Sequence, residues 1–177
     1  MKTDQLSPNG FVVTDVFEPK FLDKLISVCD TFTPTQEWPA GDAPDLPKPL
    51  PGAHREVHTL KQTDELYKEI INELDIVGTI SIEFWRDYPG YRNLLHTDFE
   101  TLRDVMIIYL DGQGGESMGT CFYDPDKFII PYVKNTGMLL FNSSKVEHGM
   151  VGEVNGVDYR RCLYINWLTY EDNLKTR

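Results

Sequence analysis

Hydrophobic and polar residues follow two different patterns along the chain, and the pattern changes near Gly78. Before that point, two segments carry apolar residues at three- and four-residue spacing, which is typical of amphipathic helices. One begins at Glu18-Pro19, where proline is favoured in a first helical turn, and the other covers 64–75. Segments rich in β-branched and aromatic residues predict short strands at 11–17 and 55–60.

After Gly78 the pattern is that of short strands separated by Gly, Pro, Asp and Asn turns. Helices followed by a run of strands favour an α+β domain whose antiparallel sheets form a sandwich or barrel, with helices on one side. We expect a single domain over 1–177, with an N-terminal helical buttress at 1–78 and a β core at 79–170. The predicted core strands are 79–85, 95–98, 105–110, 120–123, 138–141, 146–150 and 162–168.

The segment 33–52 is rich in proline and has almost no periodicity. A loop of this length in a small domain is usually functional or mobile. We expect this segment, or the loop 99–103, to act as a lid over a site.

Composition narrows the class of protein. A length of 177 residues with 41% hydrophobic residues fits one globular domain, and the formal net charge of -11 disfavours a nucleic-acid partner. Cys29, Cys121 and Cys162 show no zinc-like spacing. The start of the chain lacks an apolar signal region and no run of residues is apolar enough for a membrane span, so we expect a cytoplasmic protein without a membrane partner.

The candidate chemistry centres on His96-Thr97-Asp98 and on His148. Side chains two residues apart in a strand share a face, so His96 and Asp98 would lie side by side. An imidazole from His148, on a neighbouring strand, would complete a face of two histidines and one carboxylate. That ligand set leaves open positions on the metal and is typical of non-haem Fe(II) sites.

Arg160 and Arg161 follow the distal histidine, and strand parity separates them. Arg161 shares a face with Leu163 and Ile165, whereas Arg160 shares the other face with Cys162. Because the apolar set belongs inside, we expect Arg161 to meet an interior anion and Arg160 to point to solvent. The anion is a bound dicarboxylate, held bidentately, or an acidic residue of the protein.

Two further residues are candidates for the same pocket. Tyr109 would donate a hydrogen bond to the distal carboxylate of a cosubstrate, or would be a core tyrosine with its hydroxyl at the rim. Thr120, within Gly119-Thr120-Cys121, is a comparable candidate.

The ordered set of these motifs resembles the Fe(II)- and 2-oxoglutarate-dependent oxygenase superfamily, in particular its prolyl-4-hydroxylase-like branch. The resemblance covers about 79–168. It rests on Tyr88-Pro89-Gly90-Tyr91, His96-Thr97-Asp98, Tyr109-Leu110-Asp111, Gly119-Thr120, Phe122-Tyr123, 137–141, His148 and Arg161.

The resemblance implies a double-stranded β-helix, also called a jelly roll or cupin-like fold, with the N-terminal helices packed on one sheet. It implies that His96, Asp98 and His148 bind Fe(II) and that Arg161 binds the C5 carboxylate of 2-oxoglutarate, assisted by Tyr109. Tyr88 matches a tyrosine that lines the cosubstrate pocket. The stretch from His148 to the arginines is longer than in the tightest members, which leaves the choice between Arg160 and Arg161 open.

The activity implied is a dioxygenase reaction with O2 that releases succinate and CO2 and hydroxylates a small molecule or a peptide, such as a prolyl residue. Two alternatives stay open. One is a cupin-like metal enzyme that does not use 2-oxoglutarate, and the other is a non-catalytic jelly-roll binding module.

Overall fold

The computed structural model describes residues 1–112 and 115–168. Two helices and eleven strands make up this part of the chain. They are β1 (Lys2–Gln5), β2 (Gly10–Thr14), α1 (Pro19–Thr31), β3 (Gln36–Pro39), β4 (His54–Thr59), α2 (Glu65–Leu74), β5 (Ile80–Asp87), β6 (Leu102–Tyr109), β7 (Thr120–Tyr123), β8 (Lys127–Ile130), β9 (Thr136–Phe141), β10 (His148–Met150) and β11 (Arg160–Leu168).

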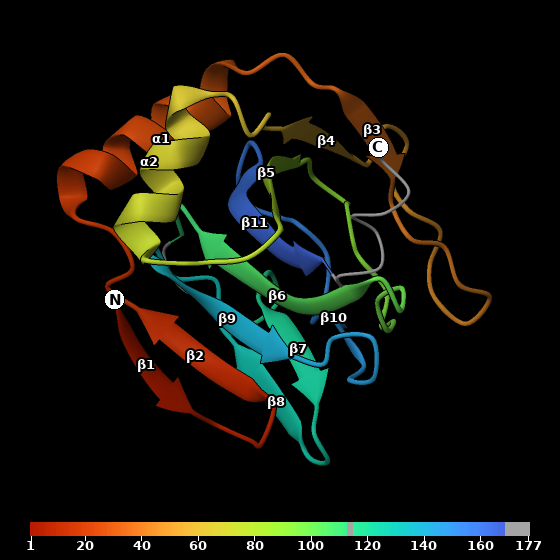
Figure 1. Cartoon of the computed structure of the whole chain (residues 1–177). Coiled ribbons are helices and arrows are strands. Elements are labelled where there is room, and N and C mark those ends of the chain that lie inside the picture. The colour runs from red at the N-terminus through yellow and green to blue at the C-terminus, as the bar shows by residue number, and fades with distance from the viewer. Residues whose placement is uncertain (113–114, 169–177) are drawn as a thin grey trace.

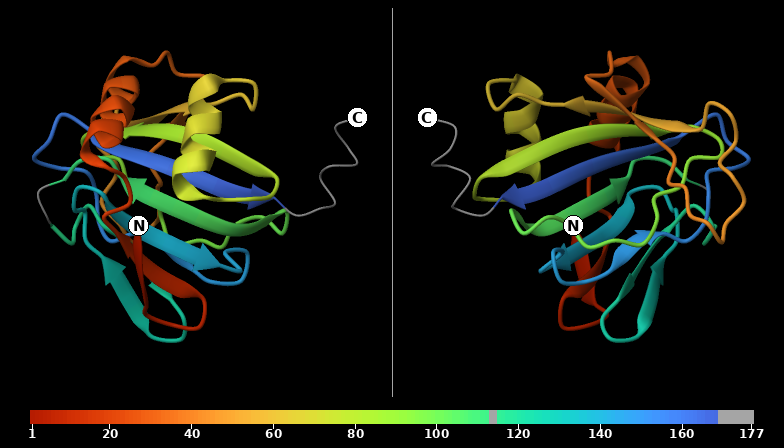
Figure 2. Two further views of the ribbon diagram at one scale, coloured as in Figure 1. Left: turned by 60° about the vertical axis from the view of Figure 1, so that its left-hand side comes forward. Right: turned by 90° about the vertical axis from the view of Figure 1, so that its right-hand side faces the viewer.

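The strands form two antiparallel sheets. The major sheet has the order β1-β2-β9-β6-β11-β5-β4-β3, and the minor sheet has the order β10-β7-β8. Both helices lie on the same outer face of the major sheet, over β5 and β11 (Figures 1 and 2). This is a jelly-roll, double-stranded β-helix arrangement, and the predicted fold class is confirmed.

Two apolar cores follow from this layering. Between the helices and the major sheet, Leu25 and Ile70 pack against Leu163 and Ile165. Between the two sheets, the core includes Ile107, Phe122 and Cys162. The central strands of the major sheet are therefore buried on both faces, which explains why β6 and β11 are rich in apolar residues at successive positions.

The predicted elements need three corrections. The N-terminal part is not only a helical buttress, because β1, β2, β3 and β4 all join the major sheet. β8 was not predicted, and β3 lies in the proline-rich segment that was expected to be loop. Segment 95–98 is not a strand, since only an isolated bridge between His96 and His148 forms there.

No helix in the described part of the chain is long and apolar enough to cross a membrane.

Candidate metal centre and its cavity

His96, Asp98 and His148 come together although His148 lies far along the chain from the other two. One ligand atom from each residue can be chosen so that all of them lie within 4.8 Å of one another. Nε2 of His96 is 3.6 Å from Oδ1 of Asp98, and Nε2 of His148 is 3.6 Å from Oδ2 of the same carboxylate. This is the face of two imidazoles and one carboxylate that the sequence predicted.

Backbone hydrogen bonds hold the two histidines in register. The amide of His96 donates to the carbonyl of His148 at 2.9 Å, and the amide of His148 donates back at 2.8 Å. The strand argument for His96 and Asp98 was therefore incomplete: pairing holds His96, whereas Asp98 lies just beyond it, with its amide donating to the carbonyl of Ser143 at 3.1 Å.

Each imidazole is also oriented by its second nitrogen. Nδ1 of His96 lies 2.8 Å from the carbonyl of Leu94, and Nδ1 of His148 lies 2.9 Å from the carbonyl of Val146. A carbonyl oxygen can only accept, so Nδ1 carries the proton in both rings. In the neutral rings the lone pair then lies on Nε2, the atom that faces Asp98, as a metal ligand requires.

The electrostatics of the three groups fit a cation. The carboxylate of Asp98 raises the pKa of His96, against the lowering effect of burial. Burial lowers the pKa of His148, which favours its neutral form. Burial raises the pKa of Asp98, but the two imidazoles outweigh it and the pKa lies below its usual value. Oδ2 of Asp98 is buried without a hydrogen-bond partner, and a metal ion would satisfy it.

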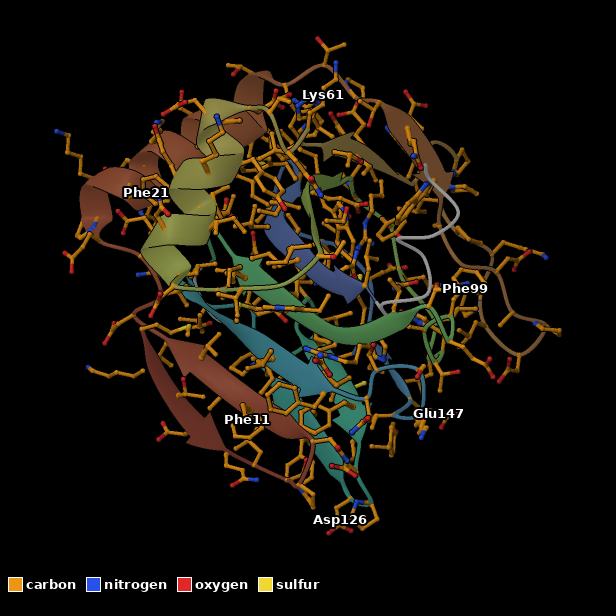
Figure 3. The ribbon with its side chains drawn as sticks, viewed as in Figure 1. Phe11, Phe21, Lys61, Phe99, Asp126 and Glu147 are labelled. Carbon is orange, nitrogen blue, oxygen red and sulfur yellow. The ribbon has the colours of Figure 1, made fainter. Side chains whose placement is uncertain are left out.

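The three side chains line a cavity of about 490 Å³ between the two sheets. The loop before β6 and strand β10 border it. In Figure 3 Phe99 marks this loop, and Glu147 lies directly before β10. Phe99 is 83% exposed, although it also lines the cavity. The walls include apolar and aromatic side chains, among them Trp38, Trp85, Val105, Ile107, Met138 and Tyr164.

Of the two adjacent arginines on β11, Arg160 lines the cavity and Arg161 does not. Arg160 is only 1% exposed and lines the cavity wall, so the expectation that it points to solvent was wrong. Arg161 lies on the opposite face of β11, where its guanidinium pairs with Asp30 and Asp111. The two arginines do lie on opposite faces of β11, as strand alternation predicted. However, the apolar face that carries Arg161 packs under the helices, and the cavity lies on the other face.

Arg160 shares its carboxylate partner with a second arginine. Nε and Nη2 of Arg160 lie 2.9 Å and 2.8 Å from Oδ2 of Asp87, and Nη1 donates to the carbonyl of Met118 at 2.6 Å. Arg55 donates from Nε and Nη2 to the same carboxylate and also lines the cavity. Two buried guanidinium groups and one carboxylate leave one positive charge at this part of the wall.

The predicted tyrosines occupy different environments. The hydroxyl of Tyr109 donates to Oγ1 of Thr120 at 2.7 Å, and Thr120 lines the cavity. Burial raises the pKa of Tyr109 to about 12, so its phenol stays protonated near neutral pH. Tyr88 is not at the cavity: its hydroxyl donates to Glu56 and its ring stacks on His54. Tyr88 comes directly after β5 and lies two residues beyond Arg86, so the two side chains share a face. The guanidinium of Arg86 faces α1, on the side of the sheet away from the cavity.

Several cavity residues were not predicted from the sequence, namely Arg55, Glu83, Trp38, Trp85, Tyr164 and Asn166. Alternation along β5 and β11 could have found some of them, because Glu83, Trp85 and Asp87 share one face and Arg160, Tyr164 and Asn166 share one face. Arg55 gave no such signal, since its strand follows an irregular segment.

No protein-family model matches the chain, and neither does any curated protein. Its fold does match solved structures. A prolyl-4-hydroxylase from Pseudomonas putida aligns with a TM-score of 0.62 at 13% identity, over 91% of this chain and 93% of that one. HygX from Streptomyces hygroscopicus, solved with nickel and 2-oxoglutarate bound, aligns with a TM-score of 0.62 at 12% identity, over 92% and 84%.

A third structure is a prolyl hydroxylase from Trichoplax adhaerens in complex with a hypoxia inducible factor peptide fragment. It aligns with a TM-score of 0.65 at 6% identity, over 96% of this chain and 87% of that one. The predicted resemblance is therefore confirmed for the fold, which is that of prolyl-4-hydroxylases and other 2-oxoglutarate-Fe(II) oxygenases.

Proposed function

We propose that this protein is an Fe(II)- and 2-oxoglutarate-dependent dioxygenase that hydroxylates a small-molecule or peptidyl substrate, with release of succinate and CO2. The observation that carries the proposal is that two groups of residues line the same cavity. These are the triad of His96, Asp98 and His148, and the buried cationic wall that contains Arg160.

His96 and His148 would bind the metal through Nε2, and Asp98 would bind it through a carboxylate oxygen. The unpartnered Oδ2 of Asp98 and the two Nδ1 hydrogen bonds to carbonyls support this assignment. A ferrous ion on such a face supplies open positions for a chelating cosubstrate and O2, and hence the oxidising power for C–H hydroxylation.

Arg160 would hold the C5 carboxylate of 2-oxoglutarate. Because Arg55 shares Asp87 with it, the two guanidinium groups and this carboxylate together carry one positive charge, which a bound carboxylate would balance. Thr120 would add a hydrogen bond. Its Oγ1 already accepts from Tyr109, which leaves its own hydroxyl hydrogen to donate into the cavity. Tyr109 then acts through Thr120.

The remaining walls would exclude water and hold the substrate carbon close to the metal. Val105, Ile107 and Met138 give the cavity an apolar surface, while Phe99 and Trp38 come from the two segments predicted as lids. Among the structural neighbours, one was solved in complex with a peptide fragment and another with hygromycin B bound, so proteins of this fold bind ligands of both kinds.

A cupin-like metal enzyme that does not use 2-oxoglutarate is the second candidate. One observation favours it: Arg160 already has Asp87 and the carbonyl of Met118 as partners, so it would be stable without a bound anion. Against this candidate, Arg55 uses the same Asp87, and one carboxylate cannot neutralise two guanidinium groups.

Anaerobic titration with Fe(II) and then 2-oxoglutarate tests the proposal. We expect a visible absorption band on adding 2-oxoglutarate, followed by succinate formation in air. His96→Ala should abolish both, whereas the control His54→Ala should abolish neither, because His54 stacks on Tyr88 away from the cavity. Metal binding without any band or succinate would favour the cupin-like alternative. Identical behaviour of wild type and His96→Ala would refute the metal site.

A further inference from the structure

Two polar side chains of the cavity have no part in holding metal or 2-oxoglutarate. Glu83 lies on β5 opposite Tyr164, and Asn166 lies on β11 opposite Ser81. Glu83 and Asn166 therefore lie on the same face of the sheet, diagonally across a strand pair, where side chains can reach one ligand. Both line the cavity that contains the metal triad.

Asn166 presents a buried acceptor without a donor, and Glu83 presents a carboxylate that accepts a single hydrogen bond from a side chain. Asn166 is 6% exposed, and its Oδ1 is buried without a hydrogen-bond partner. Glu83 accepts one hydrogen bond, from Nε1 of Trp85 at 2.8 Å. Among the described residues it has no ion-pair partner, and burial raises its pKa. Burying a carboxylate and an amide oxygen in this way is costly unless a ligand supplies donors.

Aromatic rings surround this part of the cavity. Trp85 stacks on Tyr164 with ring centroids 3.9 Å apart, and Trp38 lies 6.0 Å from Trp85, edge to face. All three line the cavity. Such walls suit the hydrocarbon part of a ligand, and their π faces attract a cationic group.

The charges of the cavity point to the same ligand. Arg55 and Arg160 contribute two positive charges, and Asp87, Asp98 and Glu83 contribute three negative charges. A ferrous ion and a 2-oxoglutarate dianion together add no net charge. One negative charge remains in the loaded cavity. Among the described residues Glu83 forms no ion pair with an arginine and is not part of the metal triad, although Arg55 attracts its carboxylate at longer range.

We propose that Glu83 and Asn166 form the recognition site for a protonated amine on the substrate. The inference rests on the proposed function, since it takes the cavity as the substrate site of an oxygenase. The ammonium would donate one hydrogen bond to the carboxylate of Glu83 and one to Oδ1 of Asn166. Trp38 and Tyr164 would enclose the adjoining carbon chain. The substrate class is therefore an amine that carries one positive charge near the carbon to be oxidised.

The test uses the protein loaded with Ni(II) in place of Fe(II) and with 2-oxoglutarate, so that no turnover occurs. Calorimetric titrations would compare three sets of probes: primary amines from propylamine to heptylamine with benzylamine, the alcohols of the same skeletons, and the corresponding carboxylates. We expect at least one amine to bind about tenfold or more tightly than its alcohol, and the carboxylates to bind least.

Glu83→Gln keeps the shape and an acceptor for Trp85 but removes the charge. It should weaken amine binding about 10- to 100-fold and leave alcohol binding unchanged. Asn166→Ala should weaken amine binding by a smaller factor. Glu37→Gln, on the exposed side of β3, is the control and should change neither.

Equal binding of amines and alcohols, or an amine preference that survives in Glu83→Gln, would overturn the inference while leaving the proposed function intact. Binding of 2-oxoglutarate to the Ni(II) form is measured first. If 2-oxoglutarate does not bind, the proposed function is refuted, and the inference with it.

Discussion

His96 and His148 are joined by a pair of reciprocal backbone hydrogen bonds, so the spacing of the two imidazoles is fixed by main-chain pairing rather than by side-chain packing alone. Gly149, the residue after His148, makes this approach possible. A Cβ at that position would lie 2.8 Å from the carbonyl oxygen of Leu94, within the segment that carries His96.

Gly149→Ala should therefore push the two segments apart and weaken metal binding. We expect the affinity for Ni(II) or Co(II) to fall about 10- to 100-fold, as for the loss of a group that orients a ligand. Calorimetric titration of the metal-free protein measures the effect. Gly152→Ala is the matched control, because its added Cβ would also be tight, at 3.1 Å from the carbonyl oxygen of Ser117, but would not touch the segment that carries His96. Equal affinities of the two variants would contradict the role of the backbone bridge.

The adjacent arginines provide an internal comparison. Arg160→Ala should lower the affinity for 2-oxoglutarate about 100-fold or more, because a charge-assisted bidentate contact is lost. Arg161→Ala should leave that affinity nearly unchanged, since Arg161 pairs with Asp30 and Asp111 on the helix side of β11. Equilibrium binding to the Ni(II) form is the measurement.

Arg160→Lys keeps the charge but loses the forked geometry, so its affinity for 2-oxoglutarate should fall between those of wild type and Arg160→Ala. Thermal unfolding of each variant separates loss of binding from loss of folding. A larger loss of 2-oxoglutarate affinity in Arg161→Ala than in Arg160→Ala would contradict the assignment.

The order of the arginines shows what the sequence can and cannot predict. Local patterns were sufficient for both helices and most strands, because amphipathic spacing and strand alternation depend on neighbouring residues. The grouping of His96, Asp98 and His148 was also predictable, since two histidines and an aspartate in this order are a chemically distinctive set. The choice between Arg160 and Arg161 was not, because β11 is buried on both faces and apolar character no longer indicates which face holds the cavity.

The cavity residues on β3 and β4 could not be predicted from the sequence for a different reason. Trp38 and Arg55 reach the cavity only because their strands pair at the edge of the major sheet beside β5. The order of the strands in the sheet is set by contacts between distant segments, and no local periodicity indicates it. Glu83 was on a predicted strand, but its role depends on which face of that strand meets the second sheet.

Asp87 should make a large and pH-dependent contribution to stability. It is fully buried and accepts hydrogen bonds from Arg55 and Arg160, so Asp87→Asn would leave two guanidinium groups without an anion. We expect the free energy of unfolding to fall by about 3–5 kcal/mol. Asp15→Asn removes an exposed ion pair with Lys2 and should change the free energy of unfolding very little.

The pH dependence follows from the direction of the pKa. Burial raises the pKa of Asp87, but the two arginines outweigh it, so the folded pKa lies below the usual value. The stabilisation is therefore complete above the unfolded pKa of about 3.9 and is lost as the pH falls through the lower folded pKa. Urea unfolding between pH 3 and pH 7 should show a steeper acid loss in wild type than in Asp87→Asn. Parallel curves would show that folding does not lower the pKa of Asp87.

The three cysteines should be unreactive in the folded protein. All are buried, and burial raises the pKa of Cys162 to about 12 and also raises the pKa values of Cys29 and Cys121. Because the thiolate is the reactive form, Ellman's reagent at pH 8 should label no thiol within minutes in native protein and all three in urea. Cys121 is 2% exposed, whereas Cys29 and Cys162 are fully buried, so any slow native labelling should occur at Cys121 first. Rapid native labelling that disappears in Cys162→Ser would show instead that the core between the sheets opens readily, and the cavity would then be a mobile rather than a preformed site.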